Sequence, residues 1–217
     1  MKVTPISLRF FILALSIVLV GELLILAVNF HTGLPMSLVL LAGRLLLCLI
    51  LLLLVAFSGP GLAALGLGSD QLTRGLQRGL LWSACCGLAA LVLFGILYAA
   101  DISPFALIST ELPTSGRELL VFFVTGTLLG PVVEEVFFRG IVYNFLRKWG
   151  VLLALAGSTA FFVVAHTLRA GIPVPQIVGG LAFAIAYEIE GTLLVPIIIH
   201  VLGNAAIFSL CLLNNFM

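Results

Sequence analysis

Long apolar runs separated by short polar breaks dominate the pattern of hydrophobic and polar positions along this 217-residue chain. A helix needs about 20 predominantly apolar residues to cross the hydrocarbon core of a bilayer. Seven runs have or approach that length: Leu8 to Phe30, Met36 to Phe57, Leu80 to Ala100, Leu119 to Leu146, Val151 to Leu168, Pro175 to Ile189 and Leu193 to Leu213. The pattern therefore predicts a chain of membrane-spanning helices.

The fourth run decides whether there are seven helices or eight. It is long and is interrupted by Gly130-Pro131, which is compatible with one kinked helix or with two elements. The connectors after it are short, as expected between antiparallel neighbours in a bundle. The predicted fold class is all-α, a polytopic transmembrane helix bundle of about seven to eight helices, with residues 1–217 forming a single integral membrane domain.

Composition strengthens the membrane assignment. Hydrophobic residues make up 62% and charged residues 9% of the chain, and the mean hydropathy is +1.32. Soluble domains have about 45 to 50% apolar and about 25% charged residues. The formal net charge of +1 gives no indication of a nucleic-acid partner, so the lipid bilayer itself is the predicted surrounding.

The placement of the basic residues predicts the orientation. Cytoplasmic connections are enriched in Lys and Arg. With the N-terminus in the cytoplasm, six basic residues fall at cytoplasmic ends and two outside; the six are Lys2, Arg9, Arg74, Arg78, Arg147 and Lys148, and the two are Arg117 and Arg169. We expect an N-terminus in the cytoplasm.

Three polar patterns interrupt the apolar helices of the C-terminal half. An ionisable group at the centre of a bilayer costs roughly 2.5 to 3.5 kcal/mol, so such groups usually serve chemistry or transport. The patterns are Glu134-Glu135-x-x-x-Arg139, Phe162-x-x-x-His166 and His200-x-x-x-Asn204.

The glutamate pattern predicts an ion pair and a separate carboxylate. Glu135 and Arg139 are four residues apart and share a helix face, which allows a carboxylate to contact a guanidinium. Glu134 is turned about 100° away and is left to act as a general base. The alternative is a buried ion-pair cluster that only joins helices.

The two histidines favour a catalytic interpretation. Counting about 1.5 Å per residue, Glu134 and His166 lie at similar depths, and His200 fits the same layer only if the last helix begins near Glu188 or Glu190. His200 and Asn204 share one helix face. Together these groups supply a base, a proton shuttle and hydrogen-bond donors for an oxyanion.

Two further charged residues, Glu22 and Arg44, lie within the first two spans. They are compatible with an ion pair, with snorkelling to the interface, or with lining a polar cavity. The four cysteines lack metal-ligand spacing such as C-x-x-C, which indicates packing residues.

The order of the three patterns resembles the CPBP superfamily, the intramembrane CAAX-prenyl-endopeptidase-like and bacteriocin-processing or immunity proteins, also called the Abi family. The resemblance covers about residues 117–213, which would form the motif-bearing catalytic core. The Leu65-Gly66-Leu67 stretch is also similar to a feature of many members.

This resemblance implies an endopeptidase that cuts a peptide bond within or near the membrane. Glu134 would activate the attacking water, assisted by His166, and His200 with Asn204 would stabilise the oxyanion. The supporting residues of the site would be Glu135, Arg139 and Phe162.

The resemblance leaves metal use open, because the family includes proteins described as metalloproteases and as glutamate-dependent proteases. Glu134, His166 and His200 would be the ligands if zinc is used. We expect no cofactor and no metal, since the sequence has no H-E-x-x-H pattern and Asn204 is a poor zinc ligand.

The expected partner is a membrane-anchored protein or peptide substrate: a C-terminal sorting-signal, prenyl-protein or bacteriocin-type precursor. The expected location is a prokaryotic plasma (inner) membrane. Two other function classes stay open, a non-catalytic immunity or scaffold protein and a proton-coupled transporter. A transporter would favour a duplicated half, and the sequence shows no such internal repeat.

Overall fold

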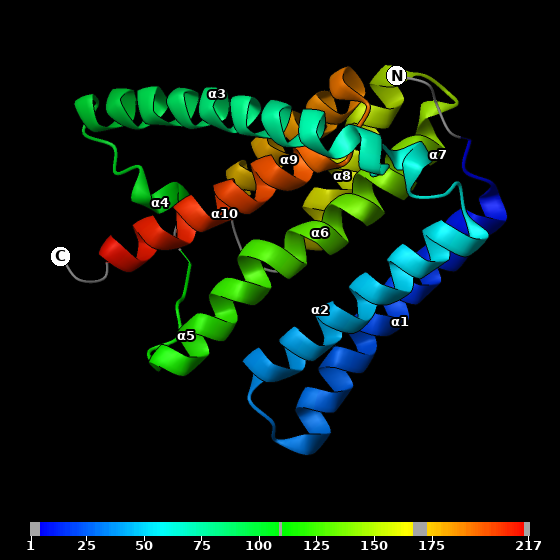
Figure 1. Cartoon of the computed structure of the whole chain (residues 1–217). Helices are drawn as coiled ribbons and strands as arrows, with labels where there is room; N and C mark the ends of the chain where they lie inside the picture. The colour runs from blue at the N-terminus through cyan, green and yellow to red at the C-terminus, as the bar shows by residue number, and fades with distance from the viewer. Residues whose placement is uncertain (1–4, 109, 167–172, 215–217) are drawn as a thin grey trace.

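The computed structural model describes residues 5–108, 110–166 and 173–214, and every regular element within them is helical (Figure 1). Two of the residues used for the orientation, Lys2 and Arg169, lie outside this described part. The all-α prediction is confirmed for the described residues.

Seven long helical stretches form the described bundle. They are α1 (Leu8–Thr32), α2 (Met36–Leu53) with a π-helical extension η1 (Leu54–Ser58), α3 (Leu72–Ala99), the continuous stretch 116–147, α8 (Val151–His166), α9 (Val174–Glu190) and α10 (Leu194–Asn214). Shorter turns accompany them: η2 (Ala63–Leu65), η3 (Ser69–Gln71) and α4 (Phe105–Ile108). Five of the seven are long and apolar enough to cross a membrane, whereas α8 and α9 have only 16 and 17 residues. The chain is an integral membrane protein.

The fourth apolar run is one helix. It consists of α5 (Gly116–Phe123), η4 (Val124–Leu129), α6 (Gly130–Glu135), η5 (Val136–Tyr143) and α7 (Asn144–Arg147), in which η4 and η5 are π-helical. We call this continuous stretch the 116–147 helix. Pro131 lies in the first turn of α6, and the wider π-helical turn just before it accommodates the missing N–H without a break. The described residues therefore contain seven long helices.

The third span begins earlier than its apolar run. The prediction placed its start at Leu80, but α3 begins at Leu72, so Gly75 and Gly79 lie within the helix. A Cβ atom at Gly79 would stand 2.7 Å from a side-chain carbon of Ile198, and one at Gly75 would stand 3.0 Å from Leu194. Both glycines therefore let α3 approach α10, against which it packs along much of its length.

The connector before α3 packs directly against the turn between α9 and α10. The backbone N–H of Leu193 donates to the carbonyl of Leu65 over 3.0 Å, and the Thr192 hydroxyl donates to the carbonyl of Gly66 over 2.5 Å. Gly66 has φ +76°, and a Cβ atom there would stand 2.4 Å from Cα of Thr192. Only glycine fits this position.

The helices carrying the polar patterns pack next to one another. The 116–147 helix contacts α8, α9 and α10, while the α1–α2 hairpin lies along its other side (Figure 1). Two interhelical ion pairs join the ends of these helices near the α9–α10 turn: Arg147 with Glu188 and Arg78 with Glu190, each 2.8 Å. This arrangement brings the three patterns to one place.

Candidate active site

Glu134 faces the two histidines predicted to accompany it. Its Oε2 atom lies 3.6 Å from Nε2 of His166 and 3.7 Å from Nε2 of His200. The side chains of Glu134 and His166 are 20% and 30% exposed, whereas that of His200 is 6% exposed. Three helices therefore present one carboxylate and two imidazoles to a common point that is partly open.

The tautomers of both imidazoles follow from their outer partners. Nδ1 of His166 lies 2.8 Å from the carbonyl oxygen of Phe162, which can only accept a hydrogen bond. Nδ1 of His200 lies 2.8 Å from the Glu135 carboxylate, which also accepts. Each Nδ1 therefore carries a proton, and each ring turns its Nε2 toward Glu134.

The predicted ion pair between Glu135 and Arg139 is present and fully buried. Their contact measures 2.9 Å, and both side chains are 0% exposed. A second guanidinium nitrogen of Arg139 donates to the carbonyl of Gly180 over 2.8 Å. The pair thus joins the 116–147 helix to α9 and, through His200, to α10.

Aromatic rings enclose this pair. The guanidinium carbon of Arg139 lies 4.8 Å from the ring centroid of Phe162 and 5.2 Å from that of Phe183. Phe162 also contacts the ring of His166 at 4.5 Å, and Phe183 stacks on His200 at 4.6 Å. Phe162 therefore contacts both the cation and one imidazole, which agrees with its predicted supporting role.

Two supporting residues, Gly180 and Phe183, were not found by sequence reasoning. Both lie on α9, whose sequence contains no charged residue before Glu188 and no polar pattern. A Cβ atom at Gly180 would stand 3.2 Å from a ring carbon of Phe162. The only available signal was a small residue three positions before an aromatic one, which is common in membrane helices.

Asn204 has a structural partner that the sequence did not reveal. Its amide nitrogen donates to the carbonyl of Gly126 over 2.9 Å. That carbonyl has no helical donor, because the N–H of Gly130 bonds to Thr125 instead and Pro131 has no N–H. One amide hydrogen of Asn204 thus satisfies the π-helical segment.

The depth argument for His200 was wrong. It required the last helix to begin near Glu188 or Glu190, but α10 begins at Leu194 and His200 still reaches Glu134. The estimate assumed parallel, regular α-helices, whereas the 116–147 helix contains π-helical segments of 6 and 8 residues and α10 is inclined to it (Figure 1).

A metal ion was considered for the same residues. Glu134, His166 and His200 offer one carboxylate and two imidazole nitrogens, the ligand types of a catalytic zinc site. Within the part of the chain that the structure describes, no group of three His, Cys, Asp or Glu side chains is arranged to hold a metal ion. The steps proposed below use only the side chains of the chain.

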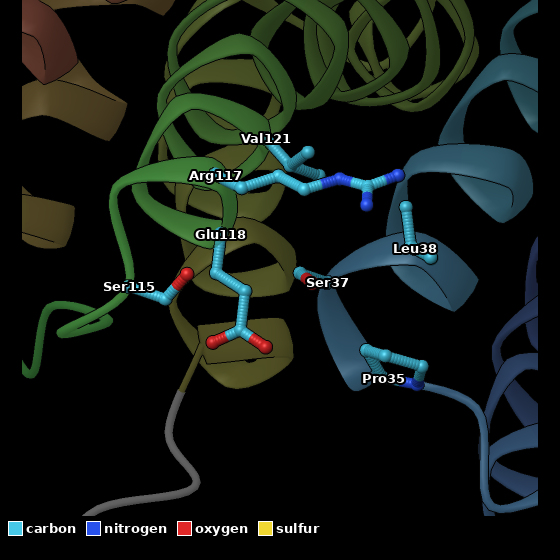
Figure 2. A pocket seen from close by; sticks show the side chains of 7 residues that line it. All are labelled: Pro35, Ser37, Leu38, Ser115, Arg117, Glu118 and Val121. Carbon is cyan, nitrogen blue, oxygen red and sulfur yellow. The ribbon is translucent and has the colours of Figure 1, made fainter.

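A polar pocket of about 180 Å³ lies between the start of α2 and the start of α5 (Figure 2). Arg117 extends from α5 toward α2, and Glu118 points between Ser115 and Ser37. None of the residues predicted to be catalytic lines this pocket. It opens at the end of the α2–α5 seam that is nearest the connector between α1 and α2.

Comparison with known proteins gives two matches. Residues 116–206 match the family model "Type II CAAX prenyl endopeptidase Rce1-like". The chain is also 32% identical over 133 residues to the membrane-embedded CAAX protease MroQ of Staphylococcus aureus (strain USA300), an alignment covering 58% of this chain and 52% of that relative. The chain thus spans about half the length of this curated relative. No solved structure matches.

Proposed function

We propose that this chain, which belongs to the CPBP family of CAAX proteases and bacteriocin-processing proteins, is an intramembrane endopeptidase that uses Glu134 to activate water. The observation that carries the proposal is the convergence of Nε2 of His166 and Nε2 of His200 on one oxygen of Glu134, at 3.6 and 3.7 Å. The matched family residues 116–206 include all three polar patterns.

In the proposed reaction, Glu134 accepts a proton from a water molecule held between its carboxylate and His166. The water oxygen attacks the carbonyl carbon of the scissile peptide bond, and a tetrahedral oxyanion forms. The proton on Glu134 then passes to the amine as the C–N bond breaks. General base catalysis of this kind contributes roughly 10²- to 10⁴-fold.

The oxyanion needs donors that are fixed before the reaction. Asn204 retains one amide hydrogen after its bond to Gly126, and His200 can donate from Nε2 when it is protonated. Glu135 holds the ring of His200 in place and would stabilise its charged form. Arg139 and Phe162 hold Glu135 and His166, respectively, so their part is positioning.

The proposed substrate is a membrane-anchored protein or peptide, because the site lies on apolar helices of an integral membrane protein. A C-terminal sorting-signal, prenyl-protein or bacteriocin-type precursor would meet this description. We place the reaction in a prokaryotic plasma membrane with the N-terminus in the cytoplasm, as the distribution of Lys and Arg favours.

The test compares membrane-protein precursors in cells that carry the wild type, Glu134→Gln or Asp70→Asn. Asp70 is an exposed carboxylate outside the site, so Asp70→Asn is the matched control. Mass spectrometry of native membranes should show a precursor that accumulates with Glu134→Gln and not with Asp70→Asn. Thermal unfolding in detergent should be unchanged by Glu134→Gln, because that carboxylate is not part of the buried ion pair.

Processing that continues at the wild-type rate with Glu134→Gln would remove Glu134 from the catalytic role. If no precursor changes with any variant, the chain is better described as a non-catalytic immunity or scaffold protein, the alternative that the sequence left open.

A further inference from the structure

The ion pair between Glu22 and Arg44 lies within the membrane and outside the three polar patterns. Arg44 is 21% exposed and Glu22 is 38% exposed. The guanidinium donates to both carboxylate oxygens: NH1 bonds to Oε1, and NH2 bonds to Oε2 over 3.3 Å. The prediction of an ion pair, one of three alternatives for these residues, is therefore the one the structure supports.

Both residues lie on helix faces that also carry core positions, and each is partly exposed. Arg44 follows Leu40 by four positions and precedes Leu47 by three, so it shares their face of α2. Leu47 is 3% exposed, and Leu40 packs against the core. On α1, Glu22 shares the face of Val18 and of Ile25, which is 5% exposed. The pair therefore occupies two positions where an apolar side chain would pack well.

Stability does not explain such a pair. An ion pair that stays partly exposed contributes little to stability. The location explains it better, since α2 packs against α6, the segment that carries Glu134. Arg44 lies near the middle of α2, which also packs against η4, the segment just before α6.

Arg44 also has unused donors. A guanidinium carries five N–H groups, and two are used by Glu22. Among the described residues, no other hydrogen bond of Arg44 is present, which leaves three N–H groups on a side chain that is 21% exposed. In an apolar environment these groups need acceptors. An extended peptide beside Glu134 would offer its carbonyl oxygens.

The charges around Arg44 favour a substrate group that is a neutral hydrogen-bond acceptor. Glu22 already neutralises Arg44, and Glu134 lies on α6, which packs against α2. An acidic group of the substrate would add a second negative charge next to Glu134 in apolar surroundings, which is costly. A backbone carbonyl accepts hydrogen bonds from the remaining N–H groups of Arg44 without adding charge.

We propose that Arg44, held in place by Glu22, binds backbone carbonyl groups of the peptide substrate on the α2 side of the scissile bond. This inference rests on the proposed endopeptidase function. It makes Arg44 a substrate-binding residue and Glu22 a positioning residue, and it makes the α1–α2 hairpin one wall of the substrate site. The polar pocket near Arg117 opens at one end of the contact between α2 and α5.

The experiment uses full-length protein with Arg44→Leu, Arg44→Lys, the double variant Glu22→Leu/Arg44→Leu, and the control Arg78→Leu. Arg78 forms another interhelical ion pair, with Glu190, away from the site. The double variant is decisive because it leaves no unpaired charge and so should remain folded. The probe is a synthetic peptide that spans the cleavage site of the precursor that accumulates with Glu134→Gln. It is used in two forms, with a free C-terminal carboxylate and with a C-terminal amide. The assay is carried out in lipid nanodiscs.

The double variant should raise KM about tenfold or more, as expected when charge-assisted hydrogen bonds to the substrate are lost, and change kcat little. The rise should be the same for the acid and the amide peptide. Arg44→Lys should recover part of the affinity, and Arg78→Leu should leave KM unchanged.

Two results would overturn the inference alone. A wild-type KM for the folded double variant would make the pair merely structural. A rise in KM confined to the free-acid peptide would make Arg44 an anion receptor instead. If Glu134→Gln accumulates no precursor at all, the proposed function fails and this inference fails with it.

Discussion

Nδ1 of His200 lies 2.8 Å from Oε1 of Glu135, the same oxygen that accepts a hydrogen bond from Arg139 over 2.9 Å. One buried carboxylate oxygen thus connects the ion pair within the 116–147 helix to an imidazole on α10. Glu135 therefore has two functions. It neutralises Arg139, as the sequence pattern predicts, and it fixes the ring and tautomer of His200, which the pattern does not reveal.

Replacing Glu135 with Ala should destabilise the protein strongly. The variant leaves the guanidinium of Arg139 without its carboxylate in a site that is 0% exposed. Removing one partner of a buried ion pair costs about 3 to 5 kcal/mol. Thermal unfolding in detergent measures the loss, with Glu134→Ala as the matched control, because the adjacent carboxylate is partly exposed. Equal unfolding temperatures for Glu135→Ala and Glu134→Ala would contradict the assigned pairing.

Asn204→Leu should leave the carbonyl of Gly126 without a donor. An unsatisfied buried acceptor costs about 1 to 3 kcal/mol. The double variant Pro131→Ala/Asn204→Leu supplies a backbone N–H five residues after Gly126, where π-helical bonding can use it. Its unfolding temperature should therefore lie above that of Asn204→Leu.

Activity separates the two functions of Asn204. If the second amide hydrogen serves the oxyanion, the double variant should regain stability but not turnover. Recovery of both would assign Asn204 to the structure alone.

Gly66→Ala should be far more damaging than Gly61→Ala. Both glycines have positive φ, +76° and +85°, so an alanine is strained at either position. Only at Gly66 does a Cβ atom meet backbone, at 2.4 Å from Cα of Thr192, whereas nothing lies within 4 Å of one at Gly61. We expect Gly61→Ala to cost about 1 kcal/mol, and Gly66→Ala to lower expression of folded protein. Similar unfolding temperatures for Gly66→Ala and Gly61→Ala would show that the contact between Gly66 and Thr192 adjusts to an alanine at little cost.

Activity should persist after treatment with a strong chelator. The proposed steps require only Glu134, the two histidines and Asn204. Turnover of the identified precursor peptide, measured before and after dialysis against chelator, tests this directly. Loss of turnover that zinc restores would assign Glu134, His166 and His200 as ligands and would replace the general-base mechanism with a metal-bound water.

Local periodicity accounts for much of what could be predicted. The i to i+4 spacing placed Glu135 and Arg139 on one helix face whatever the rest of the chain does, and the structure shows their contact. The lengths of the apolar runs likewise located all seven long helices to within a few residues, apart from the start of α3. That start lies in a less apolar segment, where length and hydropathy give no signal and where Gly75 and Gly79 pack against α10.

Contacts between helices could not be predicted from local periodicity. The bond from His200 to Glu135, the stacking of Phe183 on His200, and the bond from Asn204 to Gly126 all depend on how far one helix is displaced along another. Side-chain packing and π-helical turns set that displacement, and neither is readable from the period of the sequence.

The sequence by itself determined that the chain crosses the membrane repeatedly and carries ionisable groups on its C-terminal helices, because apolar length and the cost of buried charge are properties of each segment alone. Only the tertiary structure decided which oxygen each imidazole meets and which acceptor Asn204 serves. It also packed α2, which carries Arg44, against α6, which carries Glu134 about 90 residues away along the chain. Such relationships arise when separate helices pack, and no single helix contains them.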